Sequence, residues 1–182
     1  MNELRLIKKI QRSGDRAAAD ELVRHYYDQI YVFVKKQLSQ PDVSLDLTQE
    51  IFISMLRTIH HYDKRKGAAF RTWLFRIASN KLADWFRSRA YRNMTQTMTL
   101  DDVEAADDAD FVQMLENSEF TERVCAFVGG LASDTQTIFR LYIFGGHTFL
   151  EISKILGMAE GSVKSRYYRL IQLLGREFAD YE

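Results

Sequence analysis

The chain has 182 residues, of which 46% are apolar and 27% are charged, and this composition excludes an intrinsically disordered protein. The single cysteine, Cys125, excludes an intramolecular disulfide, and no apolar run reaches the roughly 18 residues of a membrane-spanning helix. The first residues have no signal-peptide-like apolar core, so we expect a soluble, cytoplasmic protein. One proline and nine glycines leave few helix breakers, which favours an all-α fold.

The formal net charge of zero hides an uneven distribution. Residues 1–93 carry 18 Lys and Arg against 10 Asp and Glu, a balance of +8. Residues 123–182 carry 7 against 6, a balance of +1, whereas residues 94–122 carry nine acidic residues and no Lys or Arg. This asymmetry predicts a basic part and a near-neutral part joined by an acidic connector, and the basic part is compatible with a nucleic-acid partner.

Apolar residues follow helical spacing through most of the basic part. Residues 20–38 and 44–62 each predict an amphipathic helix, with a break around Pro41 between them. A basic turn follows at Lys64 to Gly67. The expected inner faces consist of Leu22, Tyr26, Ile30, Phe33 and Val34 in the first helix, and of Leu47, Ile51, Met55 and Ile59 in the second.

Residues 70–92 predict one long helix or a closely spaced pair of helices. Both tryptophans, Trp73 and Trp85, lie on its apolar stripe, so we expect them to pack in the core rather than to stack on bases. The other members of the stripe are Phe70, Leu74, Ile77, Ala78, Leu82 and Phe86.

Residues 94–110 show no sustained periodicity and are rich in Thr and Asp, which is typical of a linker, whereas residues 111–122 can begin the next helix. We therefore expect two small helical domains, residues 1–93 and 123–182, joined by a flexible acidic linker at 94–122. The acidity has two interpretations, a solvated spacer or a segment that mimics or repels nucleic acid.

Residues 148–170 contain the signals of two helices joined by a tight turn. Thr148 and Glu151 form a T-x-x-E capping box, and Gly157 is placed to end that short helix. The next helix begins near Gly161. Its expected inner face consists of Val163, Tyr167, Leu170 and Leu174.

The opposite face of this second helix has no acidic residue and consists of Lys164, Ser165, Tyr168, Arg169 and Gln172. Carboxylates are repelled by phosphates, so their absence is typical of a helix that enters a DNA groove. Arg166, at the flank, is placed for a phosphate. The pair predicts a helix-turn-helix, and an ordinary helical hairpin is the alternative.

The run EGSVKSR at 160–166 resembles the promoter-reading helix-turn-helix of bacterial sigma factors of the extracytoplasmic-function class. DLTQEIFISMLR at 46–57 is similar to the polymerase-binding helix of that family. FRTWLFRIASNKLADWFRSR at 70–89 is similar to its promoter-melting and minus-ten-reading segment, and residues 14–31 match its opening helices more loosely. The matches occur in the family's order and cover nearly the whole chain apart from the linker.

The resemblance implies a factor that binds core RNA polymerase, directs it to promoters and assists duplex opening. Three sets of site residues follow from it. The minus-thirty-five element would meet Lys164, Ser165, Arg166, Tyr168 and Arg169. The minus-ten element would meet Asn80, Lys81 and Arg87, with further phosphate contacts from Lys64, Arg65, Lys66, Arg71 and Arg89. Core polymerase would meet Asp46, Gln49 and Glu50, which share a helix face with Ile53, beside apolar neighbours such as Phe52.

Two of these roles have structural alternatives. Asn80 can be an ordinary surface residue, and Asp46 and Glu50 can complement the dipole at a helix start. The resemblance also implies an anti-sigma protein as a partner, and a linker that enters the polymerase channel.

An enzyme is not expected, because the sequence has no phosphate-binding glycine loop, no metal-ligand spacing and no nucleophile with a supporting base, so no catalytic residue, metal or cofactor is assigned. The alternative function is a polymerase-independent helix-turn-helix regulator that would bind duplex DNA alone.

Overall fold

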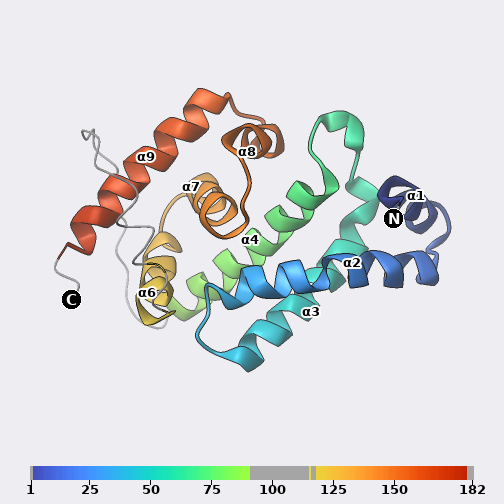
Figure 1. Cartoon of the computed structure of the whole chain (residues 1–182), viewed down its shortest axis with the longest axis horizontal. Helices are drawn as coiled ribbons and strands as arrows, with labels where there is room; N and C mark the ends of the chain where they lie inside the picture. Colours follow the sequence, from blue (N-terminus) through green and yellow to red (C-terminus); the bar gives the residue numbers. More distant parts are fainter. Residues whose placement is uncertain (1, 91–114, 116–117, 180–182) are drawn as a thin grey trace.

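The computed structural model describes residues 2–90, 115 and 118–179, and all regular secondary structure in them is helical (Figure 1). This confirms the all-α prediction. The first group comprises α1 (Glu3–Ser13), α2 (Arg16–Lys35), α3 (Pro41–Thr58) and α4 (Phe70–Ala90), with the 3-10 turns η1 (Ile59–His61) and η2 (Lys64–Lys66) before α4. The second comprises α6 (Ser118–Val128), α7 (Ser133–Phe139), the π-helical turn η3 (Arg140–Phe144), α8 (Phe149–Leu156) and α9 (Glu160–Glu177).

Local sequence signals explain where the helices of the first group begin and end. The side chains of Asn2 and Asp15 cap α1 and α2 by accepting hydrogen bonds from the third amide beyond them. Gly14 adopts the left-handed conformation, φ 62°, that ends α1, and Pro41 occupies the first turn of α3. Every residue predicted for the inner faces of residues 20–38 and 44–62 is buried.

Helix α4 is one continuous helix, which decides between the two predicted arrangements. Phe70, Leu74, Ala78 and Leu82 on its stripe are 0% exposed. Trp73 is half-buried and lies 5.4 Å, between ring centroids, from both Tyr62 and Phe70. Trp85 is also half-buried against the core, so both tryptophans pack as predicted.

The second group shows the predicted helix-turn-helix. Thr148 and Glu151 form both hydrogen bonds of the capping box, and Gly157 ends α8 with φ 68°. The residues predicted for the inner face of α9 are all buried. Cys125 is buried, and burial raises the pKa of its thiol to about 11. Helix α6 begins at Ser118, inside the range 94–122 that the sequence assigned to the linker. Most of that range, residues 94–114 and 116–117, lies outside the described residues.

Helix α4 lies between the two groups and packs against both (Figure 1). The buried apolar residues of both groups form one continuous cluster. Polar bonds cross the same boundary: the Arg71 guanidinium donates to the Gly145 carbonyl at 2.8 Å, and Arg76 donates to the Ile155 carbonyl at 2.9 Å. Within the described residues, none of the helices has the length and apolar character needed to cross a bilayer.

Candidate nucleic-acid interface

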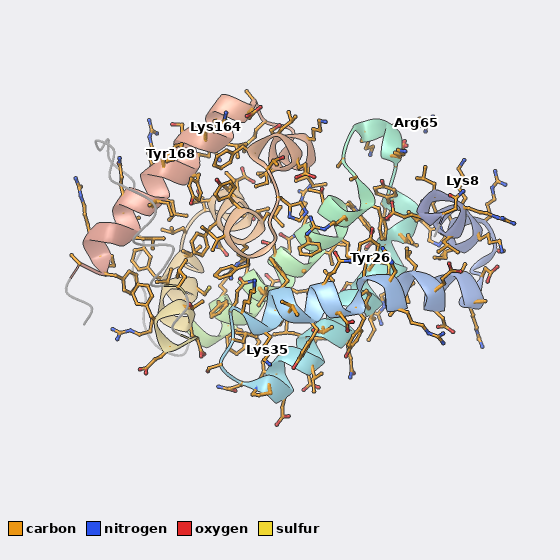
Figure 2. The ribbon with its side chains drawn as sticks, viewed as in Figure 1. Lys8, Tyr26, Lys35, Arg65, Lys164 and Tyr168 are labelled. Atoms are coloured by element: carbon orange, nitrogen blue, oxygen red, sulfur yellow. The ribbon has the colours of Figure 1, made fainter. Side chains whose placement is uncertain are left out.

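The outer face of α9 is exposed, because Val163, Tyr167 and Leu170 turn its other side into the core. Tyr168 is 45% exposed although it is a large ring. Figure 2 shows Lys164 and Tyr168 along this helix. All five residues predicted to meet the minus-thirty-five element are exposed, namely Lys164, Ser165, Arg166, Tyr168 and Arg169.

Two cations of this face are held by carboxylates. Lys164 Nζ lies 2.8 Å from Glu160 Oε1, one turn earlier in α9, and this hydrogen bond raises the pKa of the Lys164 ammonium. Arg166 Nη1 lies 3.3 Å from Asp134 Oδ2 at the start of α7. The second pair places Arg166 at the flank of the helix, as the sequence predicted. Both pairs are exposed and therefore weak enough to yield to a phosphate.

One residue of this face differs from the prediction. Gln172 is only 6% exposed, so the outer side of α9 is covered at that position and Gln172 is not available to a groove. The exposed, acid-free stretch is therefore confined to residues 164–169, about two turns of helix. This length suits one docking face in a major groove.

The minus-ten candidates lie along the exposed side of α4. Asn80 is exposed, and among the described residues its amide has no hydrogen-bond partner. Arg87 is exposed and lies 3.6 Å from Asp84. Asp84 shares this face, at i+4 from Asn80, although the sequence interpretation did not single it out. An amide with free donor and acceptor groups can pair with a base edge.

Lys81 connects two of the predicted surfaces. Its ammonium lies 3.3 Å from Glu50 Oε2 on α3, so a minus-ten candidate and a polymerase candidate are ion-paired. Asp46, Gln49 and Glu50 are all exposed along α3. The two surfaces are therefore adjacent parts of one face built from α3 and α4.

Phe52 does not belong to the polymerase surface, in contrast to the prediction. It is 5% exposed and stacks on Tyr27 of α2 with ring centroids 5.9 Å apart. On α2 and α3 the exposed large apolar residues are Ile53, 49% exposed, and Leu45, 39% exposed, on α3 and Val32, 47% exposed, on α2. Ile53 shared the predicted face, whereas Leu45 and Val32 were missed. Leu45, Gln49 and Ile53 follow each other at four-residue steps, which is the signal that could have found Leu45.

Arg71 was predicted to contact a phosphate, but here it holds the two helical groups together. Its guanidinium packs 4.6 Å over the ring of Phe75 and donates to Gly145. Its Nη1 also lies 3.2 Å from Nε2 of His147. Burial, together with the positive charge of Arg71, lowers the pKa of His147 to about 4, so the imidazole is neutral at neutral pH. In this arrangement Arg71 is not available to DNA.

The remaining basic candidates are exposed on the turn before α4. Lys64, Arg65 and Lys66 form η2, and Arg65 pairs with Asp63 at 2.9 Å. Asp63 caps the turn and Gly67 ends it with φ 90°, a conformation that glycine adopts without strain. The side chain of Arg89 lies outside the described residues.

Comparison with known families gives two matches, in the order that the sequence predicted. The family model for sigma-70 region 2 matches residues 22–92, and that for sigma-70 region 4 matches residues 126–174. The first covers most of α2 and all of α3 and α4, and the second covers α8 and most of α9, the helix-turn-helix. Together they account for well over half of the chain.

Similar proteins agree with these matches. The ECF RNA polymerase sigma-E factor of Haemophilus influenzae is 28% identical over 93% of this chain and 91% of its own length. The solved structure of CnrH in complex with the cytosolic domain of CnrY covers all of this chain and 99% of that one, with a TM-score of 0.59 at 18% identity. The sigma factor RpoE of Bartonella quintana, solved with the anti-sigma factor NepR, covers 90% of this chain and 98% of that one, with a TM-score of 0.53 at 17% identity. At these identities the two structures support the fold alone.

Proposed function

The chain belongs to the extracytoplasmic-function class of sigma factors, and we propose that three of its surfaces carry out successive steps of promoter-directed initiation. As a sigma factor it binds core RNA polymerase and directs it to promoters. It acts in the cytoplasm, where the polymerase is, and any nucleotide chemistry belongs to the polymerase. Residues 1–93 form the part that binds polymerase and the minus-ten element, residues 94–122 the acidic linker, and residues 123–182 the part that reads the minus-thirty-five element.

The outer face of α9 reads the minus-thirty-five element. Lys164, Tyr168 and Arg169 are exposed on a helix that follows a capped, glycine-ended α8, which is the geometry that presents a helix to a major groove. Ser165 lies among them, and Arg166 at the flank meets a phosphate once it leaves Asp134. This exposed, acid-free face is the observation that carries the proposal.

The exposed side of α4 takes the minus-ten element. Asn80 supplies an amide for an unstacked base, while Lys81 and Arg87 supply phosphate contacts. Both cations are paired with carboxylates in the free chain, Lys81 with Glu50 and Arg87 with Asp84. Exposed pairs of this kind contribute about 1 kcal/mol or less, so DNA phosphates can replace them.

The polymerase contact lies on α3. Asp46, Gln49 and Glu50 form an exposed polar strip, and Leu45 and Ile53 add exposed apolar surface beside it. Such a strip suits a partner with basic and apolar side chains. Binding of polymerase at Glu50 would release Lys81 for DNA, because the two are ion-paired in the free protein.

An anti-sigma protein is a further partner, as for the RpoE of Bartonella quintana. The acidic linker enters the polymerase channel, where its carboxylates stand in the path of RNA phosphates. Replacing its acids with Ser or Asn then changes the yield of abortive transcripts, and an unchanged abortive profile excludes this role.

A gel-shift series with and without core polymerase tests the proposal. Specific promoter binding is expected only after core enzyme is added, whereas an independent regulator would bind duplex DNA alone. The double variant Lys164→Ala and Arg169→Ala should weaken recognition of the minus-thirty-five element. The loss should be roughly 1–3 kcal/mol for each bidentate contact between a side chain and a base that it removes. Arg176→Ala, an exposed cation in the last turn of the same helix, is the control. Full promoter activity in the double variant refutes the assignment of this face.

A further inference from the structure

The first helix carries a basic face that the proposed function does not use. Arg5, Lys8, Lys9 and Arg12 are exposed and follow each other at i, i+3, i+4 and i+7, so they lie on one side of α1. They line a shallow hollow together with Asn2 and Leu4. The opposite side, Leu6, Ile7 and Ile10, is buried.

Inward contacts hold α1 so that its basic face points outward. The Gln11 amide donates to the carbonyls of Ile59 at 2.8 Å and Tyr62 at 2.9 Å, on the turn η1. The Tyr26 hydroxyl donates to Glu3, which occupies the only carboxylate of α1. Because η1 directly precedes the basic turn η2, the segment that anchors α1 leads into residues 64–66. Figure 2 shows Lys8 and Arg65 at the same end of the molecule.

Most of these charges have no carboxylate partner among the described residues. Lys9 pairs with Asp15 at 3.8 Å, and Arg65 pairs with Asp63. No ion pair is formed with a described residue by Arg5, Lys8, Arg12, Lys64 or Lys66. Like charges at i, i+3 and i+4 on α1 repel one another and weaken the fold slightly. A cluster of unpaired cations of this kind is typical of a surface that binds a partner rich in phosphates.

The position of this face relative to Asn80 indicates which phosphates it meets. Asn80 lies ten residues into α4, which begins at Phe70, so about 15 Å of helix separates it from the basic turn. A DNA strand advances about 3.4 Å per nucleotide, so about four nucleotides span that length. A strand bound at Asn80 that runs toward the start of α4 therefore reaches η2 and then α1.

We propose that the basic face of α1, continued by η2, binds the sugar–phosphate backbone of promoter DNA adjacent to the minus-ten element. The inference rests on the proposed function, because the DNA is placed by α4. The contact is with phosphates, which carry no sequence information, so it is not base-specific. It strengthens the hold on any promoter and makes the complex more sensitive to salt.

The test measures promoter binding by the reconstituted holoenzyme as a function of salt. The triple variant Arg5→Gln, Lys8→Gln, Arg12→Gln should bind about tenfold more weakly at low salt. The slope of log affinity against log salt should fall by about 2–3, because each phosphate that a cation neutralises contributes roughly 0.7–0.9. A promoter fragment that ends next to the minus-ten element lacks the DNA that would reach α1. The triple variant and the wild type should bind this fragment with equal affinity. Fragments that are duplex or single-stranded there show which form of DNA supplies the phosphates.

A matched pair of single variants separates DNA contact from helix stability. Arg12 and Arg176 are both exposed and both lie in the last turn of a helix, α1 and α9. Arg12→Gln should lower the slope by about 1, whereas Arg176→Gln should leave it unchanged. Both remove one exposed cation from a last turn, so both should shift thermal unfolding only slightly.

Three results bear on the outcome separately. An unchanged slope in a triple variant that still forms holoenzyme overturns the inference. A loss of affinity for core polymerase in that variant also overturns it, because the face would then belong to the polymerase. Failure of the wild-type protein to bind core polymerase would instead refute the proposed function.

Discussion

The packing of the two helical groups depends on a buried arginine, and replacing it makes a quantitative prediction. Arg140, in η3, is 0% exposed. Its Nη1 donates to Gln37 Oε1 at 2.5 Å, its Nη2 donates to the Cys125 carbonyl at 3.3 Å, and its guanidinium carbon lies 4.9 Å from the centroid of the Phe86 ring. Gln37 and Phe86 belong to the first group, so this side chain crosses the boundary. Burial lowers the pKa of Arg140.

The two single substitutions should have unequal effects. Gln37→Leu leaves a buried cation without one of its acceptors and removes the Gln37 bond to the Phe33 carbonyl, which should cost about 3 kcal/mol. Arg140→Met leaves only the neutral Gln37 oxygen without a donor, a cost of about 1–3 kcal/mol. It also relieves the desolvation of a buried charge, which is worth several kcal/mol. Its net effect should therefore be near zero.

The double variant, Gln37→Leu with Arg140→Met, should be only about 1 kcal/mol less stable than the wild type, because neither partner is left unsatisfied and only the Gln37 bond to the Phe33 carbonyl is still missing. The coupling free energy from the double-mutant cycle should be about 2 kcal/mol in favour of the double variant. Urea unfolding of the free protein measures all four species. If the two single substitutions changed the free energy of unfolding additively, the two side chains would not be in contact in solution. That result would also refute the packing of the two helical groups.

Two further changes test the boundary and the DNA surface. His147 has a folded pKa of about 4 against 6.5 when unfolded, so stability is fully present above pH 6.5 and falls as pH drops toward 4, by on the order of 3 kcal/mol. His147→Gln, which keeps an acceptor for Arg71, should remove this slope between pH 6.5 and 4 in unfolding experiments, and a variant with the wild-type slope would exclude His147 as its source. Asn80→Ala should impair promoter opening by roughly 1–3 kcal/mol while sparing upstream contacts, since an exposed residue of α4 takes no part in the core. Permanganate footprinting measures the opening, and a wild-type level of promoter opening in Asn80→Ala would contradict this role.

The helices and their inner faces could be predicted because they depend on local signals. A repeat of 3.6 residues decides which side of α2, α3 and α9 is apolar, and caps such as Thr148 and Gly157 act within one turn. The exposed face of α9 followed from the same periodicity. A sequence without an acidic residue on one helix face was therefore enough to locate the candidate groove-reading surface.

The predictions that failed depend on contacts between distant segments. Phe52 and Ile53 are adjacent in the sequence, yet Phe52 is buried and stacks on Tyr27 of α2 whereas Ile53 is exposed. Arg71 looks like a phosphate ligand until Gly145, 74 residues away, accepts its hydrogen bond. Arg140 gave no signal, since nothing in its neighbourhood marks an arginine as buried. Periodicity describes one helix at a time and cannot show which helix packs on which.

In vitro transcription with purified core polymerase tests the central claim most directly. A library of promoter fragments is transcribed with and without this protein, and the transcript starts are sequenced. Initiation should concentrate at a small set of promoters that share two sequence elements. With the double variant Lys164→Ala and Arg169→Ala, the selected promoters should no longer share the upstream element. Starts distributed as they are with the bare polymerase would contradict the account.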